Sequence, residues 1–231
     1  AFAPDIFYVF FYVAAVWLFI DAERAGSRSR LVLRSLSVAC FVLALMSKEA
    51  AVTLPAVLVV AYLLFAEGSR SLGGFLRAIA PHASVWILYL AYIVAYLRVG
   101  GGDYMLVAGR NVIRNFTTVV YYAFNLRRDG FVPVRMVPAY LFAFLICFAV
   151  LVLLLAVALL LQQEHRRFVL FGGAWFCIGV APMMLLSGIS PYYVFLALAG
   201  LALIVGVSLD VVYAALRRMS PVAAVLVLAT L

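Results

Sequence analysis

The chain has 231 residues, of which 69% are hydrophobic and 11% are charged, and its net charge is +8. Soluble domains hold about 45–50% apolar and about 25% charged residues, so this composition excludes an ordinary soluble protein. Apolar stretches near the length that crosses a hydrocarbon core predict an all-α, polytopic transmembrane bundle of about seven to eight spans.

Apolar runs divide the chain into seven candidate spans and the start of an eighth. The first is short for a crossing unless the residues before it join the same helix. The chain begins at Ala1 rather than Met and stops at Leu231 inside an apolar run, so we expect residues 1–231 to be one transmembrane domain, an internal piece of a longer membrane protein. In chain order the predicted spans are Ile6–Ile20, Leu33–Ser47, Ala50–Ala66, Ala83–Leu97, Pro138–Leu161, Phe168–Ser187 and Tyr192–Ala215, with the eighth beginning near Val222.

The placement of arginines predicts the orientation of these spans. Short cytoplasmic loops are enriched in basic residues. One set of loops holds ten of them: Arg24, Arg28, Arg30, Arg34, Arg70, Arg77, Arg166, Arg167, Arg217 and Arg218. We therefore expect this set to face the cytoplasm of a prokaryotic cell, in a multi-pass protein of the plasma membrane whose functional face is on the outer side.

The segment from Arg98 to Arg135 holds six arginines on the predicted outer side, against that rule. One explanation is that Val112–Leu126 crosses the membrane. The run contains Arg114 and several polar residues, so we expect instead a helix in the outer interface, with tyrosines at headgroup depth. Asn115-Phe-Thr117 fits a glycosylation acceptor pattern, which we set aside because nothing indicates a eukaryotic source.

The dipeptide Lys48-Glu49 is the strongest candidate for function. Lys48 is the only lysine, and the pair separates two apolar runs. A charge at the centre of a membrane helix costs about 2.5–3.5 kcal/mol on insertion scales, so a retained pair indicates use. We expect Lys48 and Glu49, together with Arg98, Arg110 and Arg114, to bind the phosphate of a lipid. The alternatives are an ion pair between Lys48 and Glu49 that caps a helical hairpin, and arginines that only tether the chain to headgroups.

Further polar residues lie in two outer loops. Asp103 and Tyr104 follow a run of three glycines, and Tyr192 and Tyr193 precede the last complete span. All four are candidates for contacts with a sugar or phosphate. The alternative for Asp103 and Tyr104 is an ordinary loop, and the alternative for Tyr192 and Tyr193 is a belt of interfacial aromatics.

The remaining titratable residues predict no cofactor site. Cys40, Cys147 and Cys177 are interpreted as small buried hydrophobes, and His82 and His165 as solvated loop residues. No metal-ligand spacing or phosphate loop is present, so we predict no cofactor, leave a divalent metal open, and expect no nucleic-acid partner. We expect Asp210, near the inner end of its span, to pair with Arg217 or Arg218, or with water.

Three stretches resemble a known family in order and spacing. Residues 45–55 (LMSKEAAVTLP) resemble the "SKE…TLP" stretch of GT-C type membrane glycosyltransferases, in the branch of protein O-mannosyltransferases and transmembrane–tetratricopeptide proteins. Residues 101–104 (GGDY) with 109–115 (GRNVIRN) are similar to its outer loop and following helix. Residues 190–200 (SPYYVFLALAG) resemble its "RYLYLPSxG" segment, with Tyr192 at or near the arginine and Ala197 in place of the proline.

The resemblance implies an enzyme that transfers a sugar from a polyprenyl-phosphate carrier on the outer side of the membrane. It implies that Lys48 and Glu49 lie beside the carrier phosphate. The family's catalytic carboxylate belongs to a loop before the start of this chain, and we assign it to neither Asp5 nor Asp103, so the catalytic residue stays unknown. The acceptor is also unknown. The alternative function is a transporter or lipid-handling scaffold that uses Lys48, Glu49 and Asp210 as a charge relay.

Overall fold

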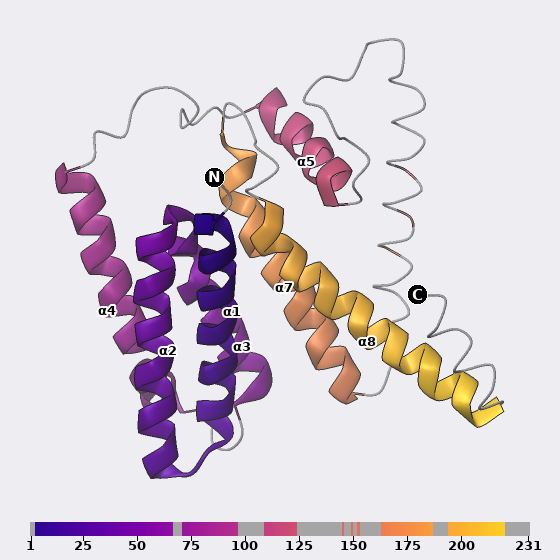
Figure 1. Ribbon diagram of the computed structural model, residues 1–231, viewed down its shortest axis with the longest axis horizontal. Coiled ribbons are helices and arrows are strands. Elements are labelled where there is room, and N and C mark those ends of the chain that lie inside the picture. The colour runs from indigo at the N-terminus through magenta and orange to yellow at the C-terminus, as the bar shows by residue number, and fades with distance from the viewer. Residues whose placement is uncertain are drawn as a thin grey trace.

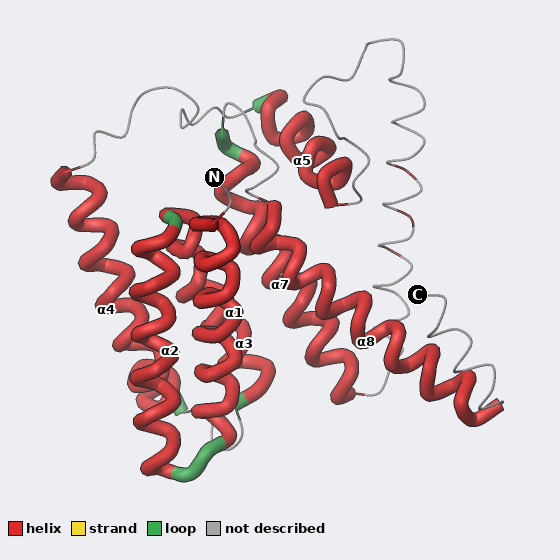
Figure 2. The backbone as a smooth tube through the Cα atoms, in the orientation of Figure 1, coloured by secondary structure: helices red, strands yellow, loops and turns green. Residues whose placement is uncertain are grey.

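The computed structural model describes residues 3–66, 71–96, 109–123, 145, 149, 152, 163–186 and 194–219. Every secondary-structure element in this part of the chain is a helix (Figure 2), which confirms the all-α class. The helices are α1 (Ala3–Arg24), α2 (Ser27–Ser47), the 3-10 helix η1 (Glu49–Thr53), α3 (Leu54–Phe65), α4 (Leu72–Tyr96), α5 (Arg110–Ala123), α7 (Gln163–Met184) and α8 (Phe195–Met219).

The helices form two antiparallel pairs that pack on each other. One pair is α1 with α2, flanked by α3 and α4, and the other is α7 with α8 (Figure 1). The two pairs meet where α3 packs on α7 and where α1 contacts α8. The short helix α5 packs on α7, at the end of the bundle where α7 ends and α8 begins (Figure 1).

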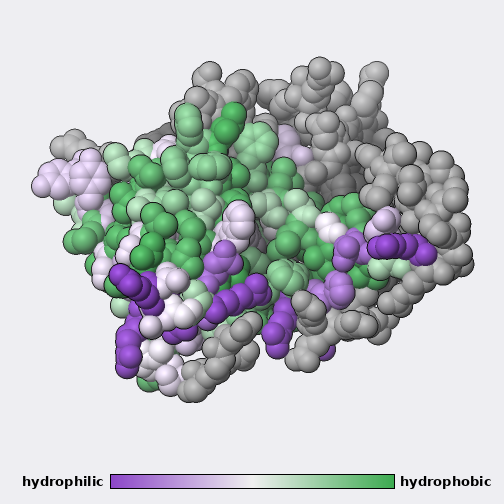
Figure 3. All heavy atoms as spheres, turned by 60° about the horizontal axis from the view of Figure 1, so that its bottom comes forward, coloured by the Kyte–Doolittle hydropathy of each residue, from purple (hydrophilic) through white to green (hydrophobic). Residues whose placement is uncertain are grey.

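Four of the described helices are long and apolar enough to cross a membrane, by length and composition. They are Asp5–Arg24, Ser27–Ser47, Leu72–Tyr96 and His165–Met184, and shorter apolar helices cover Glu49–Phe65 and Phe195–Val211. Large apolar side chains point outward, with Trp17 68%, Leu88 70% and Val94 81% exposed. Figure 3 shows the resulting apolar surface. An extended apolar surface needs a nonaqueous partner, so this is the pattern of a membrane protein.

Several helices extend beyond the predicted spans, because they continue past charges and prolines. Helix α1 extends the predicted first span to Arg24, since Glu23 is neutralised by Arg34 at 2.7 Å. Helix α4 begins at Leu72 instead of Ala83, because the Ser71 hydroxyl accepts the Gly74 N–H at 3.1 Å and caps the helix start. The predicted fifth and eighth spans lie almost wholly outside the described residues, so the total number of spans stays a prediction.

The third predicted span is two helices in sequence. Residues 49–53 form η1, and the α-helix α3 begins at Leu54. Pro55 lies in the first turn of α3, where its missing N–H leaves no hydrogen bond unmade. A short 3-10 helix that starts at Glu49 therefore separates the end of α2 from the start of α3.

The earlier start of α4 also corrects the assignment of His82. This side chain is fully buried, and its Nε2 lies 2.9 Å from the Ser37 hydroxyl. Ser37 in turn donates to the Ala15 carbonyl at 2.7 Å, so one polar junction links α1, α2 and α4. The prediction of a solvated loop histidine is wrong, because Pro81 lies inside the helix instead of ending it.

The basic residues group at one end of the bundle. The end of α1, the starts of α2, α4 and α7, and the end of α8 all lie at the lower side of Figure 1. These helix ends carry all of the ten predicted cytoplasmic arginines except Arg70, which is outside the described residues. Figure 3, in which this end comes forward, shows hydrophilic residues gathered along its lower edge.

Helices α7 and α8 touch backbone to backbone at two places. A Cβ on Gly172 would lie 2.6 Å from the Gly200 carbonyl oxygen, and a Cβ on Gly179 would lie 3.2 Å from Ala197 Cα. Small residues at such crossings let membrane helices approach closely. In contrast, a Cβ on Gly173 would meet nothing within 4 Å.

We predict that Gly172→Ala destabilises the protein and that Gly173→Ala does not. The first methyl collides with backbone, which cannot move aside locally, whereas the second enters open space and replaces glycine with a better helix former, worth about 1 kcal/mol in water. Thermal unfolding in detergent checks this, with a midpoint several degrees lower for Gly172→Ala alone. Equal midpoints for the two variants would contradict the close α7–α8 contact.

Candidate functional site

Lys48 sits at the junction of two helices, as the sequence predicts. It follows the last residue of α2 with an extended backbone (φ −160°, ψ 137°), and its N–H still donates to the Ala44 carbonyl at 2.9 Å. Glu49 opens η1 directly afterwards. The dipeptide therefore lies at the end of the bundle opposite the arginine-rich end.

Lys48 forms an ion pair with Asp5, in the first turn of α1. The two side chains keep only 14% and 15% of their surface exposed. The pairing follows from the hairpin, because α1 and α2 are antiparallel, nearly equal in length and joined by a short turn. The start of α1 therefore comes level with the end of α2.

A small cavity with polar groups in its wall lies next to this ion pair. It has a volume of about 160 Å³ and lies among α1, η1, α7 and α8. Its polar lining residues are Tyr8, Glu49 and Thr53, and apolar side chains such as Pro182 and Leu196 complete the wall. Asp5 and Tyr8 are three residues apart on α1, so they share a face and lie about one turn from each other.

The hydroxyl of Tyr8 is buried and has no hydrogen-bond partner among the residues that the structure describes. Tyr8 is 2% exposed, and its ring packs edge-on against Tyr12 at 6.0 Å between centroids. Tyr12, one turn further along, does have a partner, because its hydroxyl lies 3.1 Å from Thr53 Oγ1. A buried polar group without a partner costs about 1–3 kcal/mol, so the Tyr8 hydroxyl calls for a functional explanation.

A larger apolar cavity opens on the other side of Asp5. Its volume is about 570 Å³, and Asp5, Ile6, Val9, Phe10 and Phe195 line it. Ile6 and Phe10 are 68% and 63% exposed, so the cavity is a groove on the outer face of α1 rather than an enclosed space. In a bilayer this groove would face hydrocarbon, with the Asp5–Lys48 ion pair at one end. We call the Asp5–Lys48 ion pair, Tyr8, Glu49 and Thr53 together the Lys48 site.

Helix α5 is fastened beside the Lys48 site by one asparagine. Asn115 is 1% exposed, and its side-chain nitrogen lies 3.0, 3.3 and 2.8 Å from the carbonyl oxygens of Met183, Met184 and Leu186. The last carbonyls of a helix lack partners within it, so Asn115 caps the end of α7. Its amide is thereby inaccessible to glycosylation in the folded chain.

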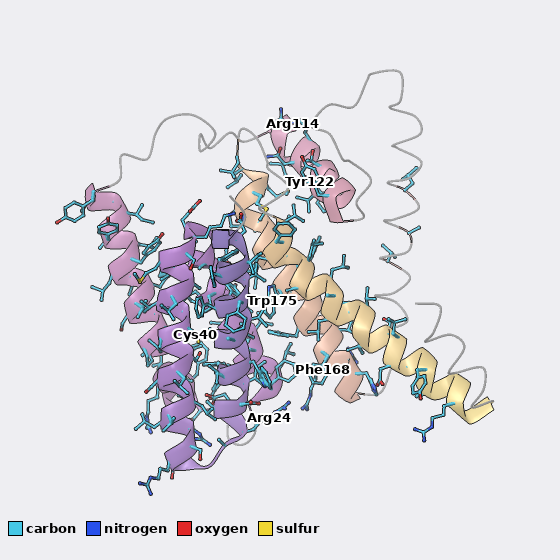
Figure 4. The ribbon with its side chains drawn as sticks, viewed as in Figure 1. Arg24, Cys40, Arg114, Tyr122, Phe168 and Trp175 are labelled. Atoms are coloured by element: carbon cyan, nitrogen blue, oxygen red, sulfur yellow. The ribbon has the colours of Figure 1, made fainter. Side chains whose placement is uncertain are left out.

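The other predicted site residues are only partly described. Arg114 is exposed on α5, at the opposite end of the bundle from Arg24 (Figure 4). It therefore shares the end that holds Lys48. The backbone of Arg110 begins α5, but its side chain is outside the description, as are Arg98, Asp103, Tyr104, Tyr192 and Tyr193. Their predicted roles stay predictions.

Asp210 does not join Lys48 and Glu49, contrary to the charge-relay arrangement. It lies toward the other end of α8 and is 69% exposed, with His165 Nε2 3.6 Å from its carboxylate. Among the described residues, the ion-pair partner of Asp210 is His165 and not the predicted Arg217, and the Arg218 side chain is outside the description. His165 belongs to α7 rather than to a loop, since that helix starts at Gln163.

The cysteines and possible metal ligands add no site. Cys40 is half-buried and Cys177 is exposed, both with free thiols, so the prediction of a buried Cys177 is wrong because it lies on the outer face of α7. Cys147 lies outside the described residues. Within the described part of the chain, no group of three or more His, Cys, Asp or Glu side chains is placed to hold a metal ion.

Sequence reasoning missed Asp5, Tyr8 and Thr53 as members of this site. The signal for Asp5 was present, because two helices of similar length joined by a short turn place their outer ends together. Tyr8 follows from Asp5 by the helical repeat. Thr53 had no sequence signal, because its position depends on η1 being a 3-10 helix.

Comparisons with known proteins return no relative. No family model matches the chain, and no curated protein or solved structure matches it either.

We predict strong energetic coupling between Asp5 and Lys48. Asp5→Ala and Lys48→Ala each leave a poorly solvated charge, so each single variant loses stability by about 1–3 kcal/mol, below the roughly 3–5 kcal/mol of fully buried pairs. The double variant removes both charges and loses less than the sum. Unfolding in detergent at pH 7 measures this double-mutant cycle, and additive losses would mean that the two groups do not interact.

We also predict that Asn115→Ala releases α5 from α7. The substitution removes the donor to three carbonyl oxygens, and its cost is about 1–2 kcal/mol, in the range of a lost helix cap. Asn115→Asp places a carboxylate against the same carbonyl oxygens and should be worse. Proteolytic cleavage between α5 and α7 should accelerate in both variants. Thr118→Ala serves as the control, because the hydroxyl of this half-buried residue bonds to the Arg114 carbonyl within α5 itself.

Proposed function

We propose that the chain is part of a membrane glycosyltransferase that takes its sugar from a polyprenyl-phosphate carrier. The observation that carries the proposal is the placement of Lys48: a largely shielded ammonium, paired with Asp5, whose side chain lines an apolar groove on the outer face of α1. A polyprenyl phosphate has the matching form, since it joins a long apolar chain to a small anion.

The phosphate is proposed to bind at Lys48. An ammonium carries three donors, so it can contact a carboxylate and a phosphate oxygen at the same time. Partial burial strengthens its attraction to the phosphate relative to an exposed lysine. Asp5 orients the Lys48 ammonium, while Arg114, together with Arg98 and Arg110, is proposed to add positive charge that offsets Asp5 and Glu49.

The prenyl chain is proposed to lie in the groove formed by Ile6, Val9, Phe10 and Phe195. Each buried methylene contributes about 0.8 kcal/mol in water, but a chain that is already in lipid gains little from this transfer. The groove therefore orients the carrier and does not supply its affinity. Selectivity for the headgroup then rests on the charged residues.

The proposed topology puts the Lys48 end outside and the arginine-rich end in the cytoplasm. This follows the positive-inside rule for the arginines at the helix ends. In this arrangement α5, with its strongly one-sided apolar face, lies in the outer interface, and the complete chain crosses the membrane about seven to eight times. The resemblance of residues 45–55 to GT-C type enzymes supports the same orientation.

Lys48 is proposed to stabilise the leaving group, which is the carrier phosphate. When the glycosidic bond to the carrier breaks, negative charge grows on the phosphate, and a positioned cation lowers the energy of that transition state. An acidic residue would orient or deprotonate the acceptor hydroxyl, and we assign no residue of this chain to that role.

We predict that Lys48→Ala lowers sugar transfer from polyprenyl-phosphate sugar by about 100-fold, because loss of one preorganised electrostatic contact typically costs about 10²–10³ in rate. The assay uses the full-length protein in liposomes. Arg28→Ala, an exposed charge at the opposite end of the bundle, is the matched control and should keep full activity.

The double variant Asp5→Asn with Lys48→Gln separates catalysis from folding. It removes the ion pair without leaving a lone charge, so it should fold and still be inactive. Transfer at the wild-type rate by folded Lys48 variants would refute the proposal.

A further inference from the structure

One face of α8 carries a groove toward the arginine-rich end of the bundle. Two open cavities of about 450 and 440 Å³ adjoin there, and Asp210 lines both of them. The first also touches the start of α7, where His165 and Phe168 line it. None of the described residues of the Lys48 site lines either cavity, so this groove is separate from the place proposed for the carrier.

The groove changes from apolar to polar along α8. Leu203 and Val207 line its first part, and Asp210, Tyr213 and Arg217 line its second part, toward the end of the helix. Successive members of this set are three or four residues apart, so they share one face of α8. A groove with an apolar part followed by a charged part has the same division as a membrane lipid.

The apolar part is hollow at Gly206, where α8 carries no side chain. A Cβ on Gly206 would meet no described atom within 4 Å, whereas a Cβ on Gly172 or Gly200, where the same two helices touch, would collide with backbone. Leu203 and Val207 beside it are half-buried against other apolar side chains and form the floor of the hollow. Such a hollow fits a segment of hydrocarbon chain.

Two opposite charges line the polar part, and both are accessible. The Asp210 side chain is 69% exposed even though His165 Nε2 lies 3.6 Å from its carboxylate. Arg217, two helical turns further on, is exposed as well. A carboxylate attracts an ammonium group, and a guanidinium attracts a phosphate. The occupant should therefore carry both a cation and a phosphate.

These two charges distinguish among phospholipid headgroups. A purely anionic headgroup, such as that of phosphatidylglycerol, would meet the Asp210 carboxylate without a cation to offer it. A choline headgroup carries a cation but no N–H, so it cannot donate a hydrogen bond to the carboxylate. Ethanolamine carries an ammonium with three N–H donors, as a lysine side chain does, close to its phosphate.

We propose that this groove binds a phospholipid with an ethanolamine headgroup. Its ammonium pairs with Asp210, its phosphate contacts Arg217, and one of its acyl chains passes over Gly206. Seven residues separate the two charged positions by about 10 Å along the helix axis, and the long arginine side chain can narrow that gap. The inference does not depend on the proposed function, because it uses none of the residues of the Lys48 site.

The test measures lipid binding to the full-length protein in detergent by native mass spectrometry. Dipalmitoyl phosphatidylethanolamine, phosphatidylcholine and phosphatidylglycerol are titrated in turn. Wild type should bind one ethanolamine lipid about tenfold more tightly than either of the others, which corresponds to about one charge-assisted hydrogen bond. Asp210→Asn should abolish this preference. Arg217→Gln should weaken the binding of all three lipids, because each of them contains the phosphate.

Gly206→Leu tests the apolar part of the groove. The new side chain fills the hollow, so the ethanolamine lipid should bind about tenfold more weakly, as expected when about two methylenes can no longer be buried. The unfolding temperature should stay the same or rise, because the side chain enters open space and replaces glycine with a better helix former. Gly173→Leu is the matched control: it adds the same side chain at another open position, outside the groove, and should bind the lipid as wild type does.

Two sets of results would overturn the proposal. Equal affinities for the three lipids, or an unchanged preference in Asp210→Asn, would refute the headgroup assignment. Wild-type lipid binding by Gly206→Leu would refute the path of the acyl chain. Binding of soluble glycerophosphoethanolamine as tightly as the lipid would refute it too, because that compound has the headgroup and no acyl chain.

Discussion

The ion pair between Asp5 and Lys48 is the constraint on which the functional end of this molecule depends. It joins the first turn of α1 to the residue that ends α2, and so closes the open end of a helical hairpin. Both side chains are largely shielded from water, so either charge would be destabilising if the other were removed. The pair therefore fixes the relative height of α1 and α2, and with it the positions of Tyr8 and Glu49.

Around this pair the bundle separates two kinds of surface. The outer face of α1 carries an apolar groove, and the inner face carries a smaller cavity with hydrogen-bonding groups. The charged pair lies between them. Such an order fits the proposed carrier, with Lys48 at the boundary between its apolar chain and its phosphate.

The sequence was sufficient for the features that follow from helical periodicity and charge. It predicted the helical class, the turn at Lys48, and the loops whose arginines group at one end. It failed where tertiary contacts decide: Ser71 starts α4 earlier than hydropathy indicates, and His82 is buried because Ser37 lies opposite on another helix. Asn115 resembled a modification site in sequence, and only the fold shows its amide against the end of α7.

The glycine contact between α7 and α8 has a mechanical consequence. With backbone against backbone at Gly172 and Gly200, the two helices cannot come closer without a clash between their main chains. The two helices therefore behave as a stiff unit, and Asn115 of α5 is bound to the same unit.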